Sequence, residues 1–245
     1  MGLSFFVCDG TVITSVLATA LPSFDLAPET GGPRWRAEAP VLTVNADRDD
    51  VERKLAAGGL ACPACGGVLA GWGRARERKL RGPAGRVSRL TPRRARCRGC
   101  GRTHVLLPAR CLARRADEAG VIGTALEAKA AGAGHRAIAG LLGRPASTVR
   151  GWLRAFTARA ELVRQAFTAL AAGLVTDPPL PGPAGSAAGD AVAAVAAAAA
   201  AAARFLSVGV VARWQLAAAV TSGMLLAPSW AAGMINASWP WAAGG

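Results

Sequence analysis

Four of the six cysteines fall into two Cys-x-x-Cys pairs, and this spacing constrains the fold more than any other feature of the chain. Cys62 and Cys65 lie in "CPACGG", and Cys97 and Cys100 lie in "CRGCGR". Two residues between cysteines let both sulfurs of a tight turn reach one metal ion, and the glycine after each pair permits the turn that aims amide N–H groups at the thiolates. We therefore predict a closed tetrahedral four-thiolate site that holds one structural Zn²⁺ per chain.

Other uses of these cysteines fit the sequence less well. Disulfides belong in secreted chains, whereas the N-terminus lacks a basic segment before its apolar run, and a thioredoxin-like redox pair would need a βαβ context. Iron has the same thiolate ligands, but no residue selects it, and four thiolates leave no open position for catalytic water. His104 can replace a cysteine or act as a polar neighbour, while Cys8 and Cys111 are expected to be free thiols.

The segment between the cysteine pairs predicts a basic β-hairpin. "GWGRARERKLRG" and "RVSRLTPRRARC" have strand character and flank the turn "GPAG" at 82–85, and Glu77 is the only acid from Gly71 to Ala116. A row of guanidinium groups matches the phosphates along a nucleic-acid backbone, whereas a few arginines would suffice to offset the charge of a metal–thiolate cluster. The residues predicted to contact phosphates are Arg74, Arg76, Arg78, Arg94 and Arg96.

Downstream of the cysteines, apolar spacing predicts three helices. The last two are joined by Gly143, which supplies a left-handed turn, and Pro145, which starts the final helix. Two short helices joined in this way are typical of a helix-turn-helix unit, although an ordinary helical hairpin has the same pattern. The residues expected on the buried faces are Val121, Ile122, Ala125 and Leu126, then Ile138, Leu141 and Leu142, then Val149, Trp152, Leu153 and Phe156.

The outer face of the final helix is small and polar at its start and basic further along. Such a helix can approach base edges in the major groove, so Ser147, Thr148, Arg150 and Arg154 are the predicted base-reading residues. Apolar residues continue through 157–174 and suit either packing onto the first helix or dimerisation. The sequence therefore does not distinguish a monomer from a homodimer.

The C-terminal quarter predicts an alanine-rich tail. "TDPPLPGPAGSAAGD" at 176–190 is a Pro/Gly linker, and Ala196–Ala203 is an unbroken run of the strongest helix former. Arg204 and Arg213 interrupt this segment, so a soluble helical hairpin is favoured over a transmembrane helix.

Together these patterns predict an α+β chain of several modules. The expected divisions are a disordered extension at 1–44, a helix plus zinc ribbon at 45–110, a helix-turn-helix domain at 111–175, the linker at 176–190 and the helical tail at 191–245.

"CPACGG", then Gly-Trp-Gly-Arg-x-Arg, then "RRARCRGCGRTH" and the paired helices resemble the N-terminal DNA-binding part of insertion-sequence transposases. More closely, residues 50–175 resemble a bacterial family of unknown function that keeps both modules and ends in an alanine-rich tail. The resemblance implies zinc at the four cysteines and DNA contact by the helix near Pro145, but no reaction. A transposase needs three carboxylates that hold two metal ions, and the few acids after Gly120 lie on predicted helices or in the linker.

The net charge of +14, from 29 Lys+Arg against 15 Asp+Glu, indicates a polyanionic partner. We therefore expect a non-enzymatic, cytoplasmic, nucleoid-associated protein that binds double-stranded DNA sequence-specifically, as a transcriptional regulator or a transposase-derived factor. No small-molecule substrate is expected, and a membrane is the less favoured surface. One alternative is an adaptor that docks on a transcription or transposition assembly. The other is an RNA binder, which the scarcity of stacking aromatics apart from Trp72 disfavours.

Overall fold

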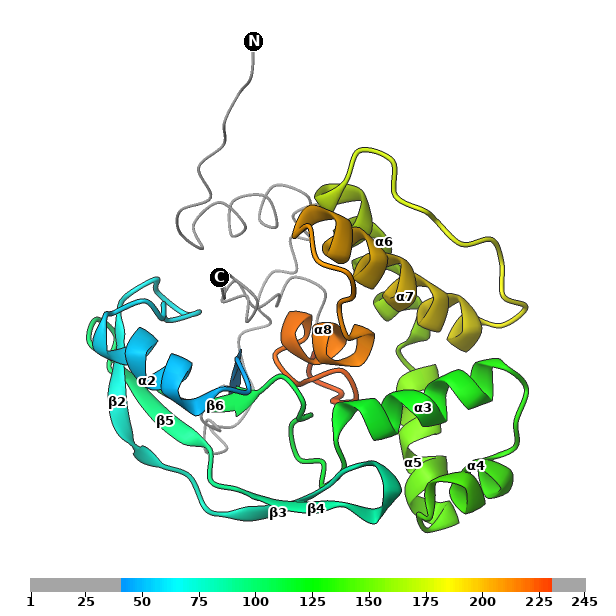
Figure 1. Ribbon diagram of the computed structural model, residues 1–245, viewed down its shortest axis with the longest axis horizontal. Helices are drawn as coiled ribbons and strands as arrows, with labels where there is room; N and C mark the ends of the chain where they lie inside the picture. The colour runs from blue at the N-terminus through cyan, green and yellow to red at the C-terminus, as the bar shows by residue number, and fades with distance from the viewer. Residues whose placement is uncertain (1–40, 231–245) are drawn as a thin grey trace, which may run out of the picture.

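The computed structural model describes residues 41–230, which form a sheet region followed by a helical region (Figure 1). The predicted mixed α+β content is confirmed. The sheet region contains β1 (Val41–Val44), α2 (Arg48–Ala56), β2 (Leu69–Arg74), β3 (Arg78–Arg81), the 3₁₀ turn η1 (Pro83–Gly85), β4 (Val87–Leu90), β5 (Arg93–Cys97) and β6 (Thr103–Pro108). The helical region contains α3 (Ala119–Ala130), α4 (His135–Leu142), α5 (Ala146–Thr157), α6 (Ala160–Leu174), α7 (Ala187–Phe205) and α8 (Arg213–Val220).

The segment between the cysteine pairs forms a hairpin whose two halves belong to different sheets. Near the cysteines, β2 pairs with β5 inside a four-stranded sheet of order β1-β6-β5-β2. Further out, β3 pairs with β4 alone, and the predicted turn at 82–85 closes this outer half. We call the outer half, residues 78–90, the arm. It extends away from the four-stranded sheet, along the bottom of the view, towards α4 and α5 (Figure 1).

β1 lies parallel to β6 and at the edge of the four-stranded sheet, with Val41 opposite Val105. The sequence placed residues 41–44 in the disordered extension, and this part of that prediction is wrong. Leu42 and Val44 are buried in the sheet core, and the Thr43 hydroxyl donates a hydrogen bond of 3.2 Å to the Ala218 carbonyl of α8. Residues 1–40 lie outside the described part of the chain.

The core of the sheet region is small. Its central side chains are Leu69, Ala95 and Leu106, and α2 covers them with Val51 and Leu55. Cys62 and Cys97 belong to the same buried cluster. The cysteine turns are therefore part of this core.

The predicted faces of α3 and α5 are confirmed. Val121, Ile122, Ala125 and Leu126 are buried on α3, and Val149, Trp152, Leu153 and Phe156 are buried on α5. The prediction for α4 is wrong at Leu141, which is 71% exposed. The buried face of α4 is centred between Ile138 and Ala139, and a residue two positions beyond Ala139 is turned well away from that direction.

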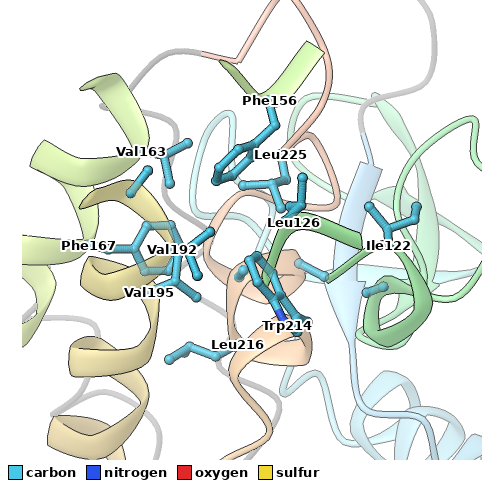
Figure 2. Close-up of a cluster of buried hydrophobic side chains, with 14 of the residues drawn as sticks. Ile122, Leu126, Phe156, Val163, Phe167, Val192, Val195, Trp214, Leu216 and Leu225 are labelled. Carbon is cyan, nitrogen blue, oxygen red and sulfur yellow. The ribbon is translucent and has the colours of Figure 1, made fainter. Parts of the chain in front are cut away.

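The alanine-rich tail fills the core of the helical region, so it is not a separate module. α6 is a new helix after α5, and Val163, Phe167 and Leu170 on its apolar face are buried against α7. That face was expected to pack onto the first helix or to mediate dimerisation, and α7 occupies it instead. Figure 2 shows Phe167 directed at Val192 and Val195 of α7, with Trp214 and Leu216 of α8 beside them.

α7 is the one helix within residues 41–230 that is long and apolar enough to cross a membrane, with a mean hydropathy of 1.4 over its best window. Just over half of that window, 56%, is buried against the rest of the protein. Its contacts with α3, α5, α6 and α8 are those of a core helix.

Candidate metal centre and nucleic-acid interface

The two cysteine pairs meet at one point of the sheet region. The Sγ atoms of Cys62, Cys65, Cys97 and Cys100 all lie within 4.8 Å of one another. The Sγ atoms of Cys62 and Cys100 are 3.7 Å apart, and those of Cys65 and Cys97 are 3.4 Å apart. A tetrahedral zinc site with Zn–S bonds of about 2.3 Å places its sulfurs about 3.8 Å from one another. The four thiols therefore fit one such ion.

Each cysteine turn has the glycine geometry that its sequence predicts. Gly66 and Gly101 both have positive φ, at 71° and 72°. The Gly66 N–H donates to the Cys62 carbonyl at 2.8 Å, and the Gly101 N–H donates to the Cys97 carbonyl at 3.1 Å. An L-residue rarely adopts this backbone conformation, so both positions favour glycine.

Backbone N–H groups point at the thiolates, as predicted. The N–H groups of Gly99 and Cys100 lie 3.3 and 3.4 Å from the Cys97 Sγ. The hydrogen bond from the Cys100 N–H, and then those from Cys65 and Gly99, lower the pKa of Cys97 to about 6. A lowered pKa favours the thiolate, which is the form of cysteine that binds metal.

Gly67 shows how closely the backbone surrounds these sulfurs. A Cβ atom there would lie 3.1 Å from the Cys97 Sγ and 3.3 Å from the Cys65 Sγ. These separations are too short for ordinary packing, so a side chain would push the two turns apart.

His104 is a buried neighbour of the cluster. It lies on β6, and its Nε2 is 3.3 Å from the Cys62 Sγ. Four thiols already complete a tetrahedron, so His104 is placed to support Cys62 instead of replacing a cysteine. Cys111 is a buried free thiol, as predicted, and burial raises its pKa. Cys8 lies outside the described residues.

The predicted phosphate-contacting arginines do not form one row. Arg74 and Arg76 are exposed at the end of β2 and in the connection to β3. Arg78 is only partly exposed, and its Nε and Nη2 atoms are buried. The expected alternation fails here because β2 ends at Arg74, after an irregularity in its pairing, and the connection from Ala75 to Glu77 breaks the strand.

The two arginines of β5 also differ from each other. Arg94 is partly buried, with its Nε atom enclosed. Arg96 is exposed, and its guanidinium carbon lies 4.8 Å from the centre of the Trp72 ring. Trp72 is itself 52% exposed, so the pair forms a flat cationic and aromatic surface on the sheet.

α4 and α5 are joined by a tight turn that has the predicted conformation. Gly143 is left-handed at φ 60°, and Pro145 caps α5 from an extended conformation. The exposed face of α5 carries Ser147, Arg150 and Arg154, while Thr148 is partly buried. The predicted base-reading residues therefore share one helix, with three of the four open to solvent.

A shallow basic hollow runs beside that face. Its basic lining residues are Lys129 at the end of α3, His135 at the start of α4, and Arg150 and Arg154 of α5. No acidic side chain lines it. Sequence reasoning identified the two arginines but missed Lys129 and His135, because neither has a distinctive local pattern.

A buried ion-pair network joins the arm to the turn before α5. Asp117 is 2% exposed and accepts hydrogen bonds from Arg81 of the arm and Arg144 of the turn, at 2.6 Å each. Arg144 also donates to the Gly82 carbonyl at the tip of the arm, at 2.9 Å. We call these three charged residues, Arg81, Asp117 and Arg144, the latch.

Neighbouring contacts reinforce the latch. The backbone N–H of Arg81 donates to the Ala116 carbonyl at 2.7 Å, and the backbone N–H of Glu118 donates to the Arg81 carbonyl at 2.9 Å. The largely buried Glu118 carboxylate pairs with Arg86 at 3.3 Å and with Arg110 at 3.4 Å. The arm therefore has a fixed position against the N-terminal end of α5.

Comparison with known proteins gives one match. The family described as a domain of unknown function (DUF6431) matches residues 62–152. The matched segment begins at the first cysteine of the cluster and ends within α5, so it includes the arm and the latch. Neither the curated proteins nor the solved structures give a match. The resemblance to insertion-sequence transposases stays a prediction.

Proposed function

We propose that this protein binds double-stranded DNA sequence-specifically, through a helix-turn-helix formed by α4 and α5 and a zinc ribbon that holds one structural Zn²⁺. The observation that supports this most directly is the exposed face of α5. It combines small polar residues with Arg150 and Arg154, beside a hollow lined by basic and no acidic residues. A transcriptional regulator and a transposase-derived factor without a catalytic domain both fit this arrangement.

In this proposal the two ends of α5 have different tasks. Ser147 and Thr148 are short, so the start of the helix can approach base edges in the major groove. Arg150 and Arg154 follow one helical turn apart and can reach guanine or phosphate. Lys129 and His135 lie across the hollow, where the DNA backbone would pass.

The sheet region would supply contacts that do not depend on base sequence. Arg74, Arg76 and Arg96 are exposed and suit phosphate contact, while Arg78 and Arg94 are less accessible. Each phosphate that a protein neutralises releases a counterion, so these contacts would make the affinity strongly salt-dependent. The latch would hold them at a fixed position relative to α5.

We propose no reaction for this chain. Two carboxylates of the helical region already have structural partners: Glu127 accepts a hydrogen bond from the Trp214 Nε1 at 2.8 Å, and Glu161 pairs with Arg164 at 2.6 Å. A cytoplasmic, nucleoid-associated role follows from the DNA proposal.

The alternative is an adaptor that docks on a transcription or transposition assembly. Two exposed apolar side chains favour it, Leu141 on α4 and Trp72 on β2, because aromatic and aliphatic anchors are common at the centres of protein interfaces. The adaptor would place its basic surface against acidic protein instead of DNA.

Selection of bound fragments from random duplex DNA, followed by affinity measurement at several salt concentrations, tests the proposal. We expect Arg150→Ala to relax sequence preference by about 1–3 kcal/mol at one position. Arg76→Ala should weaken binding to all sequences and reduce the salt slope by about one. Arg53→Ala, on the exposed face of α2, is the charge-matched control. No enrichment of any sequence, with no salt-dependent complex, would favour the adaptor.

A further inference from the structure

A second basic hollow lies away from α5, where the connection from β1 to α2 meets the bend between the sheet and the arm. It has a cavity volume of about 110 Å³. Residues from four separate stretches of the chain line it, at 44–52, 74, 89–93 and 106–110, and Glu52 is the only acidic one among them. The basic lining residues are Arg48 of α2, Arg74 of β2, Arg89 of β4, Arg93 of β5 and Arg110 after β6.

The acidic neighbours leave much of this charge uncompensated. Glu52 pairs with Arg93 at 2.8 Å. Arg89 and Arg110 have partners that do not line the hollow, Glu77 at 2.7 Å and Glu118 at 3.4 Å. The side chains of the other two arginines, Arg48 and Arg74, make no hydrogen bond or ion pair with any other residue of 41–230.

Arginines gathered around a hollow repel one another, and an anion bound between them removes that repulsion. The guanidinium group is planar and carries paired N–H donors, which match the oxygens of a phosphate. A hollow of about 110 Å³ is well above the roughly 10–15 Å³ that one water needs, so it has room for a group larger than a single water. A phosphate group is of this size.

We propose that this hollow is a phosphate-binding site, with Arg48 and Arg74 as its principal unpaired donors. Only Arg74 was among the residues that the sequence singled out for phosphate contact. The phosphate belongs either to a nucleic-acid backbone or to a small phosphorylated molecule. The site is separate from α5 and does not rest on the proposed base-reading helix.

The test is to titrate the metal-loaded full chain with inorganic phosphate and to monitor binding by NMR or calorimetry. The ionic strength is kept constant with chloride. The double variant Arg48→Gln/Arg74→Gln should bind phosphate about tenfold or more weakly than the unmodified protein. Arg53→Gln is the control, because Arg53 lies on the same helix as Arg48 but does not line the hollow. Equal zinc content and circular dichroism establish that both variants are folded.

Two further probes identify the source of the phosphate. If the site serves a DNA backbone, the double variant reduces the salt slope of binding to random duplex DNA by about two. If it serves a small molecule, a mononucleotide 5′-phosphate binds more tightly than inorganic phosphate, and the DNA salt slope stays unchanged. If the double variant and Arg53→Gln bind inorganic phosphate, the mononucleotide and duplex DNA equally well, the proposed site is wrong. Arg150→Ala, on the proposed base-reading helix, should leave the binding of inorganic phosphate unchanged. The phosphate site and the proposed function can therefore fail independently of each other.

Discussion

The sheet region and the helical region of this protein are held together by different forces. The helical region has one continuous buried cluster that extends from Leu112 to Trp230 and includes Phe156, Phe167 and Trp214. The sheet region has only two small clusters, one of which contains Cys62 and Cys97. A core of that size contributes little on its own, and small domains of this kind usually need a metal or a disulfide. The comparison implies that the sheet depends on its cysteine cluster, while the helices do not.

The two regions also differ in their charged residues. The sheet region and the arm carry most of the arginines, and the helices of the C-terminal half are rich in alanine. Repulsion among the arginines opposes folding of the sheet, which increases its dependence on the cysteine cluster and on the latch. The following four experiments test this division, from the largest expected effect to the smallest.

Cys62→Ser should have the largest effect, because it removes one ligand from the proposed zinc site. Structural zinc contributes on the order of 10 kcal/mol to folding in small zinc domains. We expect zinc content to fall well below one per chain and amide protons of β2, β5 and β6 to lose protection from exchange. The helical signal in circular dichroism should persist. Cys111→Ala, outside the cluster, should keep the metal.

If the helices unfolded together with the sheet in the Cys62→Ser variant, the two regions would form one cooperative unit. The comparison between them would then be wrong. Amide exchange measured residue by residue distinguishes this outcome from local loss of the sheet.

Asp117→Asn should have the next largest effect, because it removes the charge at the centre of the latch. Arg144 is only 7% exposed at its side chain and would lose its nearest carboxylate. Breaking a buried ion pair typically costs about 3–5 kcal/mol, and partial exposure of Arg81 places the expected loss near the lower end. Urea unfolding measures it.

Glu77→Gln is the matched control for the latch, since Glu77 forms a surface ion pair with Arg89. An exposed pair of this kind contributes up to about 1 kcal/mol. Equal losses in the two variants would show that the latch does not hold the arm to the helices.

Gly123→Ala should destabilise the helical region alone. The added methyl group would overlap the ring of Trp214, which packs directly on the Gly123 backbone. Overpacking of this kind costs about 1–3 kcal/mol, so thermal unfolding of the helices should shift down while zinc content stays the same.

Gly120→Ala on the same helix is the control for Gly123→Ala. The added methyl group meets no atom within 4 Å, and Gly120 lies in the first turn of α3, so the substitution should be neutral or stabilise the helix by less than about 1 kcal/mol. Destabilisation by both substitutions to the same extent would contradict the packing of α8 onto α3.

Leu141→Gln should have the smallest effect. The side chain is 71% exposed, and surface substitutions usually change stability by less than about 0.5 kcal/mol. Ile138→Ala on the same helix should cost about 2–5 kcal/mol, because Ile138 is 1% exposed. A loss of several kcal/mol in Leu141→Gln would mean that Leu141 is buried, as its sequence spacing predicts.

Local patterns in the sequence predict a large part of this structure. The Cys-x-x-Cys spacing identifies the four cysteines that meet, and apolar periodicity identifies the buried faces of α3 and α5. The Pro/Gly turn at 82–85 and the left-handed Gly143 are also recognisable, because each is fixed by the chemistry of a few adjacent residues.

Features that depend on distant partners are not visible in the sequence. Arg81, Asp117 and Arg144 come from three segments, and no periodicity links them. The packing of α7 onto α6 is equally hidden, because alanine gives little contrast between the faces of a helix. The second basic hollow, which we propose to bind phosphate, combines residues from four stretches of the chain, so it forms only when the chain is folded.

The most direct test of the central claim is to measure the zinc content of the purified protein together with its binding to genomic DNA fragments, before and after chelation. We predict one zinc per chain and salt-dependent, sequence-selective binding that falls strongly when the metal is removed, because the phosphate contacts of the sheet region are then lost while α5 stays folded. Stoichiometric zinc without any DNA binding at low salt would retain the metal centre and contradict the proposed function.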